Sequence, residues 1–282
     1  NMLECIIVSV AYNPPPDLAK NLSVNYFPHL VVDNSKEESK WLKDMCYNQG
    51  HQYYWQGGNT GIAAALNCGA RLALEQGCTH IVTMDQDSCL NDELLAQLSE
   101  FAEKISYSKS CAIISPLHSV SGLHDYNQGN LVKDDPMISM TSGNLVNLTI
   151  WQQLGGFDER LFIDGVDFDY YLRAHLAGYK VLTLCNLLMP HNLGSQCKVH
   201  KVLGYNIEVL NHSAIRKYYI ARNYLYLYQT YKQKYSPVGI FIKTLLKMIV
   251  AIVCFEQNKL SKLKLLALGI IDYFRGKFGE LK

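Results

Sequence analysis

Two carboxylates follow an apolar segment in the first third of the chain. Residues 79–84 are mostly apolar and lead into Asp85-Gln86-Asp87-Ser88. Two charges at the end of a buried strand each need a partner. Carboxylate oxygens are preferred ligands of Mg²⁺ and Mn²⁺, so the pair favours a divalent cation that in turn takes phosphate oxygens. The alternative is a solvated turn with two helix-capping acids, because Asp-x-Asp is common.

Two further segments could contact a nucleotide. Asp33 ends the apolar segment 30–33, and a strand-end carboxylate can accept a hydrogen bond from the ring N–H of uracil or thymine. Gly57-Gly58-Asn59-Thr60-Gly61 leads into an alanine-rich segment. Its small residues let a ligand approach the backbone, and a helix N-terminus favours phosphate. Each pattern alone is also typical of an ordinary turn.

A third carboxylate cluster lies in residues 162–174. Helical spacing places Asp169 and Arg173 four residues apart, which favours a structural ion pair. Asp167 then lies on another side of the helix start, where it could face a substrate. One positioned carboxylate is what a general base requires. His191 differs from the other histidines because it ends an apolar strand and precedes a loop.

Strands and helices alternate along the first half of the chain. The patterns predict strands at 5–12, 30–33, 52–56, 79–85 and 111–116, and helices at 59–76 and 92–105. This alternation predicts an α/β fold with a mostly parallel, doubly wound sheet. Ligands bind such sheets beyond the carboxyl ends of the strands, where Asp33 and Asp85 fall. We expect loops around the site at 117–136 and helices from residue 215 onward.

In combination these segments resemble an inverting glycosyltransferase of family 2, most closely its bacterial rhamnosyltransferase branch. The matching segments, in chain order, are Val8-Ser-Val-Ala-Tyr-Asn-Pro14, Val31-Val-Asp-Asn-Ser35, Gly58-Asn-Thr-Gly-Ile-Ala-Ala-Ala-Leu-Asn67, Met84-Asp-Gln-Asp-Ser88, Thr141-Ser-Gly-Asn-Leu145, Leu154-Gly-Gly-Phe-Asp158, residues 162–174, Pro190-His191 and Tyr218-Tyr-Ile-Ala-Arg-Asn223. The resemblance implies the GT-A nucleotide-diphospho-sugar transferase fold, a mixed, mostly parallel sheet between helices, with a helical C-terminal extension.

The resemblance also implies a role for each of seven side chains. Asp33 would recognise the pyrimidine base with Tyr12 nearby, Asn59 would line the nucleotide pocket, Asp85 would contact the ribose or the metal, Asp87 and His191 would ligate the divalent cation (Mg²⁺ or Mn²⁺), and Asp167 would be the catalytic base. Many family members carry an acid where this chain has Val166. The neighbouring Asp164 could replace part of its acceptor contacts.

The implied reaction is transfer of L-rhamnose from dTDP-L-rhamnose to a lipid-linked saccharide acceptor in bacterial O-antigen or capsule synthesis. A UDP-sugar donor, for galactofuranosyl or other hexosyl transfer, is the alternative because Asp33 would recognise uracil and thymine similarly. A sugar-phosphate nucleotidyltransferase should carry a glycine-rich basic loop after the first strand, where this chain has Asn13-Pro14-Pro15-Pro16. A non-catalytic membrane-bound scaffold should have lost Asp87 or Asp167, and both are present.

Composition limits the partners and the compartment. The 26 Lys and Arg residues nearly balance 25 Asp and Glu residues, so no basic excess indicates nucleic-acid binding. Nine cysteines without a C-x-x-C pair are typical of a reducing compartment, and no basic leader precedes the first strand. We therefore expect a cytoplasmic protein. Its predicted domains are a catalytic domain at 1–214, with a nucleotide-sugar half at 1–116 and an acceptor half at 117–214, and a helical region at 215–282.

The C-terminal region is strongly basic. Residues 232–282 contain ten Lys and Arg residues against three acids. The uncharged piece 248–255 is eight residues long, well short of the roughly 20 that a spanning helix needs. Basic amphipathic helices can lie on an anionic membrane surface, here the inner face of the cell membrane. The alternative is a helical hairpin packed on the catalytic domain or on a second subunit of a homo-oligomer.

Overall fold

The computed structural model describes residues 3–86, 88, 90–104, 110–119, 131–137, 141–190, 198–202 and 204–282. The chain forms two compact units. The first contains residues 1–158 and 170–191, and the second contains residues 159–169 and 192–282. The predicted division into a catalytic domain at 1–214 and a helical region at 215–282 stays a prediction.

An eight-stranded sheet forms the centre of the first unit, among the residues that the structure describes. Its strands are β1 (Cys5–Ala11), β2 (His29–Asp33), β3 (Gln52–Trp55), β4 (His80–Asp85), β5 (Cys111–Ser119), β6 (Val132–Asp134), β7 (Asn144–Asn147) and β8 (Lys180–Pro190). Their order is β3-β2-β1-β4-β7-β5-β8-β6. Strands β1 to β5 and β8 run in one direction, whereas β6 and β7 run against them. The predicted mixed, mostly parallel sheet is confirmed.

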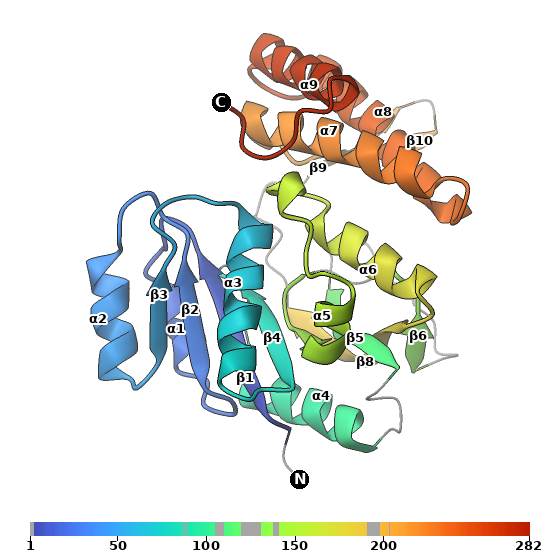
Figure 1. The fold of residues 1–282 in the computed structure, drawn as a ribbon. Helices are drawn as coiled ribbons and strands as arrows, with labels where there is room; N and C mark the ends of the chain where they lie inside the picture. Colours follow the sequence, from blue (N-terminus) through green and yellow to red (C-terminus); the bar gives the residue numbers. More distant parts are fainter. Residues whose placement is uncertain are drawn as a thin grey trace. The chain divides into compact units, whose positions relative to one another are not determined.

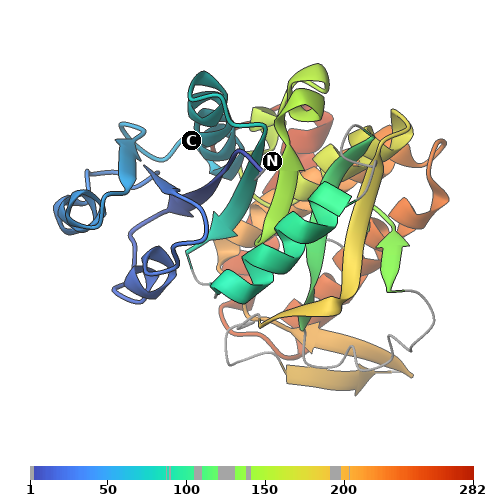
Figure 2. The same ribbon diagram turned by 90° about the horizontal axis from the view of Figure 1, so that it is seen from below.

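Helices cover both faces of this sheet (Figures 1 and 2). They are α1 (Leu18–Leu22), α2 (Lys40–Asn48), α3 (Ile62–Glu75), α4 (Asp92–Lys104) and α5 (Leu148–Gln153), followed by α6 (Val166–Leu176), which begins in the second unit. Strand β1 is buried along its whole length, because helices pack on both of its faces. Ile7 packs in the cluster that holds α4, whereas Val8 faces α3, where a Cβ on Gly69 would lie 2.3 Å from Val8 Cγ1.

The element bounds differ from the sequence predictions mainly at turns. Helix α3 begins at Ile62 rather than at residue 59, because Gly61 has φ +88°, a conformation outside the helix. The expectation of loops throughout 117–136 is wrong: β5 extends to Ser119, and β6 occupies Val132–Asp134. Strand β6 is a three-residue edge strand paired with β8 alone, so it lacks the apolar run that marks a buried strand.

The second unit is mainly helical. It contains η2 (Glu159–Leu161), the hairpin of β9 (Lys198–Val202) and β10 (Tyr205–Val209), α7 (Ala214–Tyr231), η3 (Ser236–Val238), α8 (Gly239–Cys254) and α9 (Lys259–Phe274). Helices α7 and α9 approach closely, since a Cβ on Gly269 would lie 2.3 Å from the Tyr218 carbonyl oxygen. Leu245 and Ile252 of α8 complete their shared apolar core. The predicted helical C-terminal part is confirmed.

One helical stretch in the described part of the chain has the length and composition to cross a membrane. Residues Ser236–Cys254 number 19 and have a mean hydropathy of 2.0, with 28% of that stretch buried in the structure. The stretch includes Lys243 and Lys247, which had limited the uncharged piece to residues 248–255. Phe241 and Met248 are buried within the unit, as in an ordinary core helix.

Candidate functional site

The register of the parallel strands brings Asp33 and Asp85 to one edge of the sheet. Ala11, the last residue of β1, pairs with Asp33 of β2, and its neighbour Val10 pairs with Asp85 of β4. The two carboxylate-bearing residues therefore flank the carboxyl end of the central strand. Tyr12 follows directly, with 46% of its surface exposed. This edge is where a doubly wound sheet binds its ligands.

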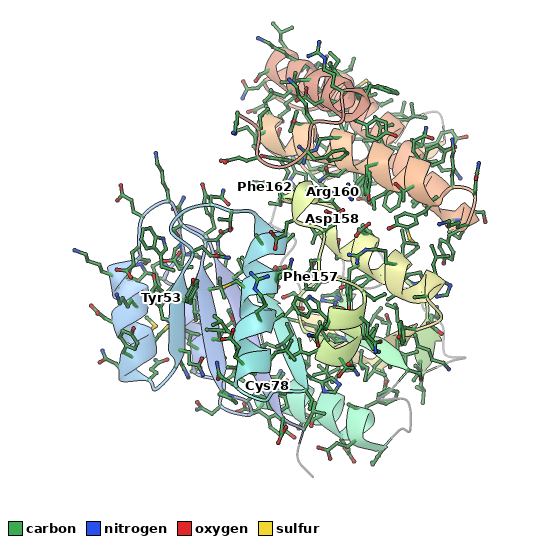
Figure 3. The ribbon with its side chains drawn as sticks, viewed as in Figure 1. Tyr53, Cys78, Phe157, Asp158, Arg160 and Phe162 are labelled. Carbon is green, nitrogen blue, oxygen red and sulfur yellow. The ribbon has the colours of Figure 1, made fainter. Side chains whose placement is uncertain are left out.

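Asp33 is fully buried and holds the loop that follows it. Its Oδ1 accepts a hydrogen bond from the Ser35 amide at 2.9 Å. Its Oδ2 accepts from the Ser39 amide at 3.0 Å and from the Tyr53 hydroxyl at 2.6 Å. Burial, followed by the adjacent Asp33 carboxylate, raises the pKa of Tyr53, so the hydroxyl keeps its proton and donates. A carboxylate offers about four acceptor positions, so these three donors leave little of Asp33 for another partner. Base recognition by Asp33 stays a prediction. Figure 3 shows Tyr53 in the part of the ribbon that carries β3.

Asn59 belongs to a turn fastened to the end of β2. Its Oδ1 accepts from Asn34 Nδ2 and from the Gly61 amide, both at 3.1 Å. Asn34 Oδ1 in turn accepts from the backbone N–H and the hydroxyl of Thr60, at 2.9 and 3.0 Å. The turn that precedes α3 is therefore fixed against the strand end that carries Asp33. The predicted contact of Asn59 with a nucleotide is not tested by these bonds.

The ends of β1 and β4 are joined by a reciprocal pair of hydrogen bonds. The Tyr12 amide donates to Gln86 Oε1 at 2.8 Å, and Gln86 Nε2 donates to the Tyr12 carbonyl at 3.1 Å. The Asp85 amide donates to Ser142 Oγ at 3.1 Å. Since these contacts use the backbones of Tyr12 and Asp85, the strand ends are fixed while the Tyr12 ring lies exposed and Asp85 half-buried.

Two of the predicted metal ligands, Asp87 and His191, lie outside the described residues. Within the described residues, no group of three or more His, Cys, Asp and Glu side chains is arranged to hold a metal ion. The half-buried carboxylate of Asp85 is the predicted ligand that the structure does place. The complete metal site stays a prediction.

Asp167 lies in the first turn of α6, within the second unit. It is half-buried, and its Oδ1 accepts a hydrogen bond from the Phe168 amide at 2.9 Å. Burial, with the charges of Asp164 and Asp167, raises the pKa of Tyr224 on α7, so this neighbouring phenol stays protonated. The preceding turn is unusual, since Phe162, Asp164 and Gly165 all have positive φ, at 66°, 62° and 84°.

Helix α7 holds this turn through two polar side chains. Asn223 Nδ2 lies 2.9 Å from the Leu161 carbonyl oxygen and 2.8 Å from those of Ile163 and Asp164. Arg216 forms a two-pronged ion pair with Asp164, with Nε and Nη2 at 3.1 and 3.0 Å from Oδ1. Asp164, which could have contacted an acceptor, is thus engaged within its own unit. We call residues 161–165 the base turn, because they lead into the helix that carries Asp167.

The other end of the base turn is held by aromatic contacts of the second unit. Phe162 stacks on Tyr219 with ring centroids 5.2 Å apart. The Arg160 guanidinium lies 5.5 Å from the centre of the Tyr226 ring. Figure 3 shows the side chains of Arg160 and Phe162 where η2 leads into the base turn.

The sequence patterns indicated the motif of Asn223 but gave it no role. Arg222 and Asn223 are both fully buried. Arg222 donates to the Leu161 and Gly279 carbonyl oxygens at 3.1 and 2.8 Å. The available signal was a charged residue and an amide within the apolar and aromatic run from Tyr218 to Tyr228, because buried polar groups require partners.

Comparison with known proteins identifies the family. A family model described as glycosyl transferase family 2 matches residues 10–135, from the end of β1 through β6. The dTDP-rhamnosyl transferase RfbF of Shigella flexneri is 28% identical over 242 residues, which make up 79% of this chain and 78% of that relative. The chain is thus similar to the glycosyltransferases of family 2. The predicted family and its proximity to the rhamnosyltransferases are thereby confirmed.

Solved glycosyltransferase structures share the fold of this chain. The structure of GalNAc-T7 with UDP, GalNAc and Mn²⁺ is 13% identical and superposes with a TM-score of 0.59 over 84% of this chain. This chain spans about half of that protein, at 49% of its length. A structure of residues 1–349 of Staphylococcus aureus TarS is 11% identical, with a TM-score of 0.50 over 97% of this chain and 92% of that one. These likenesses confirm the predicted GT-A fold.

Proposed function

We propose that this enzyme is an inverting rhamnosyltransferase. It transfers L-rhamnose from dTDP-L-rhamnose to a hydroxyl of a lipid-linked saccharide in bacterial cell-surface polysaccharide synthesis. The observation that carries the proposal is the likeness to the Shigella flexneri dTDP-rhamnosyl transferase, which extends over more than three quarters of both chains. The proposed site of action is the cytoplasmic face of the membrane, where such an acceptor would be presented.

The donor is proposed to bind at the edge of the sheet that carries Asp33 and Asp85. Two features support this placement: the fixed turn around Asn59 and the exposed ring of Tyr12. The Tyr12 ring is suited to stack on a pyrimidine, since an aromatic face stacks on any base. The fixed backbone around these residues would keep the nucleotide in one position.

Asp167 is proposed to act as the general base. It takes the proton of the acceptor hydroxyl while that oxygen forms a bond to the anomeric carbon of the sugar. The bond from this carbon to the diphosphate oxygen breaks at the same time, and dTDP leaves with the bonding electrons. A single displacement inverts the anomeric carbon and needs one carboxylate, in contrast to the carboxylate pair of most glycoside hydrolases.

The predicted metal ligands suit a divalent cation. Asp85 supplies a half-buried carboxylate at the sheet edge, and carboxylate oxygen is a ligand type that suits Mg²⁺ and Mn²⁺. Asp87 and His191 would complete the set. A bound cation would stabilise the negative charge that develops on the diphosphate. The base turn and α7 would hold Asp167 whether or not the cation is bound.

A panel of sugar nucleotides tests the proposal. We expect release of dTDP from dTDP-L-rhamnose in the presence of a saccharide acceptor, and loss of this activity in chelator. Asp167→Asn should remove the activity while dTDP binding persists, whereas Asp17→Asn, at an exposed acid of the first unit, should leave it unchanged. Turnover of a UDP-sugar alone would overturn the donor assignment. Absence of turnover with every donor would overturn the enzymatic function.

A further inference from the structure

A pocket of about 780 Å³ opens in the second unit where two helices begin. Residues 211–214, which lead into α7, line one side, and residues 257–262, which lead into α9, line the other. The lining includes Lys259 and Lys262 but no Asp or Glu. The pocket is therefore basic, although the enzyme as a whole is nearly neutral.

The two helices present their positive ends to the same pocket. They run in the same direction, because Glu256 bonds to Lys217 and Lys262 near their starts, whereas Ala221, further along α7, lies against Gly269, further along α9. Neither helix has an acid in its first turn, and the side chain of Asn258 does not cap α9. Ser213 Oγ caps α7 by accepting from the Arg216 amide at 3.3 Å, so the uncapped first turn of α9 and the dipoles of both helices favour a negative charge here.

Beside this pocket lies a buried cluster with more positive than negative charge. Lys217 and Lys262 donate to the two oxygens of Glu256 at 2.7 and 2.8 Å, and the three side chains are 3%, 5% and 0% exposed. Lys262 also donates to Asn211 Oδ1. Two ammonium groups carry six N–H bonds, whereas the described residues offer them three acceptors. The uncompensated charge and the unused donors both call for an anion.

Burial acts on the titratable groups of this cluster and its pocket. It lowers the pKa of Lys217, and the hydrogen bond to Glu256 opposes that shift. Burial alone would raise the pKa of Glu256, but the hydrogen bonds from Lys217 and Lys262 outweigh it and lower that pKa. Burial, and after it the charges of Arg216 and Lys217, lowers the pKa of His212 to about 4, so this pocket residue is neutral at pH 7. The site thus keeps hydrogen-bond donors without a second carboxylate.

The surroundings of the pocket are apolar on one side. Leu260 lines the pocket and is 84% exposed. The apolar stretch Ser236–Cys254 ends two residues before Glu256. An anion with an attached hydrocarbon chain would meet apolar side chains next to the basic pocket.

We propose that this pocket binds a phosphate group, with Lys262 and the first turn of α9 as its donors. The phosphate is either the headgroup of an anionic membrane lipid or a diphosphate such as lipid-linked saccharides carry. This second site lies wholly in the helical unit and does not depend on which sugar is transferred.

Titration calorimetry with inorganic diphosphate tests the site in the full-length enzyme, in chelator so that a metal-bound donor site does not contribute. We expect saturable binding that Lys262→Met weakens about 10- to 100-fold, the usual effect of losing a hydrogen bond to a charged group. Ser261→Asp should abolish binding by repulsion, yet an acid in the first turn stabilises a helix, so this variant should fold. Lys264→Met, an exposed lysine of α9 outside the pocket, is the matched control and should bind normally.

Flotation with vesicles then identifies the source of the phosphate. If a lipid headgroup binds, the wild-type enzyme and Lys264→Met float with vesicles of phosphatidylcholine and phosphatidylglycerol, while Lys262→Met and Ser261→Asp do not. If a free or lipid-linked diphosphate binds, calorimetry separates the variants and flotation does not. Equal affinity of all four proteins for diphosphate, or no saturable binding to the wild type, would overturn the proposal. Neither result would bear on dTDP release from the donor.

Discussion

Replacing Asn223 by Ala should slow sugar transfer without weakening donor binding. Asn223 does not belong to the sheet edge proposed for the nucleotide, and it lies on α7 with its amide against three carbonyl oxygens of the base turn. That turn contains residues with positive φ and leads directly to Asp167. Loss of the amide therefore removes a constraint on the position of the base.

The size of the effect follows from which carbonyls lose their donor. Leu161 keeps the amide of Ile163 at 2.8 Å and Arg222 Nη2 at 3.1 Å. The carbonyl oxygens of Ile163 and Asp164 lose the donor that the structure shows for them. An unsatisfied buried group costs about 1–3 kcal/mol, and water can reach this half-buried turn, so we expect about 2 kcal/mol. Domains are stable by about 5–15 kcal/mol, so the variant should remain folded with a loosened base turn.

Steady-state kinetics and urea unfolding separate the two effects. A shift of about 1 Å in a catalytic group can cost about 100-fold in rate, so we expect kcat to fall about 10- to 100-fold while KM for the donor changes less than about twofold. Asn206→Ala, at an exposed position of β10, is the matched control. Wild-type kcat combined with reduced stability would show that Asn223 is only structural. Unchanged kcat and unchanged stability would refute the hydrogen-bond argument itself.

Four further changes have distinct expected results. Asp167→Asn should lower transfer about 10²–10⁴-fold, the usual contribution of a general base, with unchanged binding of dTDP by calorimetry. Tyr53→Phe removes a 2.6 Å hydrogen bond to the buried carboxylate at the end of β2, and should lower the free energy of unfolding in urea by about 1.5–3 kcal/mol. Gly69→Ala would place a Cβ 2.3 Å from Val8 Cγ1 and should lower the free energy of unfolding by about 1–3 kcal/mol. Gly239→Ala, whose Cβ would meet open space in α8, should raise the free energy of unfolding by up to about 1 kcal/mol in the same assay.

The strand-end carboxylates could be placed from the sequence because the underlying rule is geometric. Strands β1, β2 and β4 are buried apolar runs, and their carboxyl ends must share an edge once they pair in parallel. The placement of Asp33 and Asp85 at one edge of the sheet follows from that rule alone. The rule does not say what the side chains contact, and the internal donors to Asp33 come from Ser39 and Tyr53, which no spacing pattern connects to it.

Short and exposed strands could not be predicted in the same way. β6, β9 and β10 contain three to five residues, mix charged with apolar side chains and lie largely exposed. Their pairing depends on a partner strand rather than on their own burial. The start of α3 differs from the prediction for a related reason: Asn59 and Thr60 precede an alanine-rich segment, but their side chains bond to Asn34. Contacts between distant segments decided each of these cases.

The contact between α7 and the base turn shows why one motif can matter for both fold and catalysis. Arg222 and Asn223 are fully buried, so every N–H that they carry needs an acceptor. The base turn has positive φ at Phe162 and Asp164, and the carbonyls of Leu161, Ile163 and Asp164 take their donors from the side chains of α7. Each segment satisfies the other across about 60 residues of sequence, a separation that the bonds of Asn223 span directly. A change in either segment should therefore affect the position of Asp167 before it affects the sheet that is proposed to bind the donor.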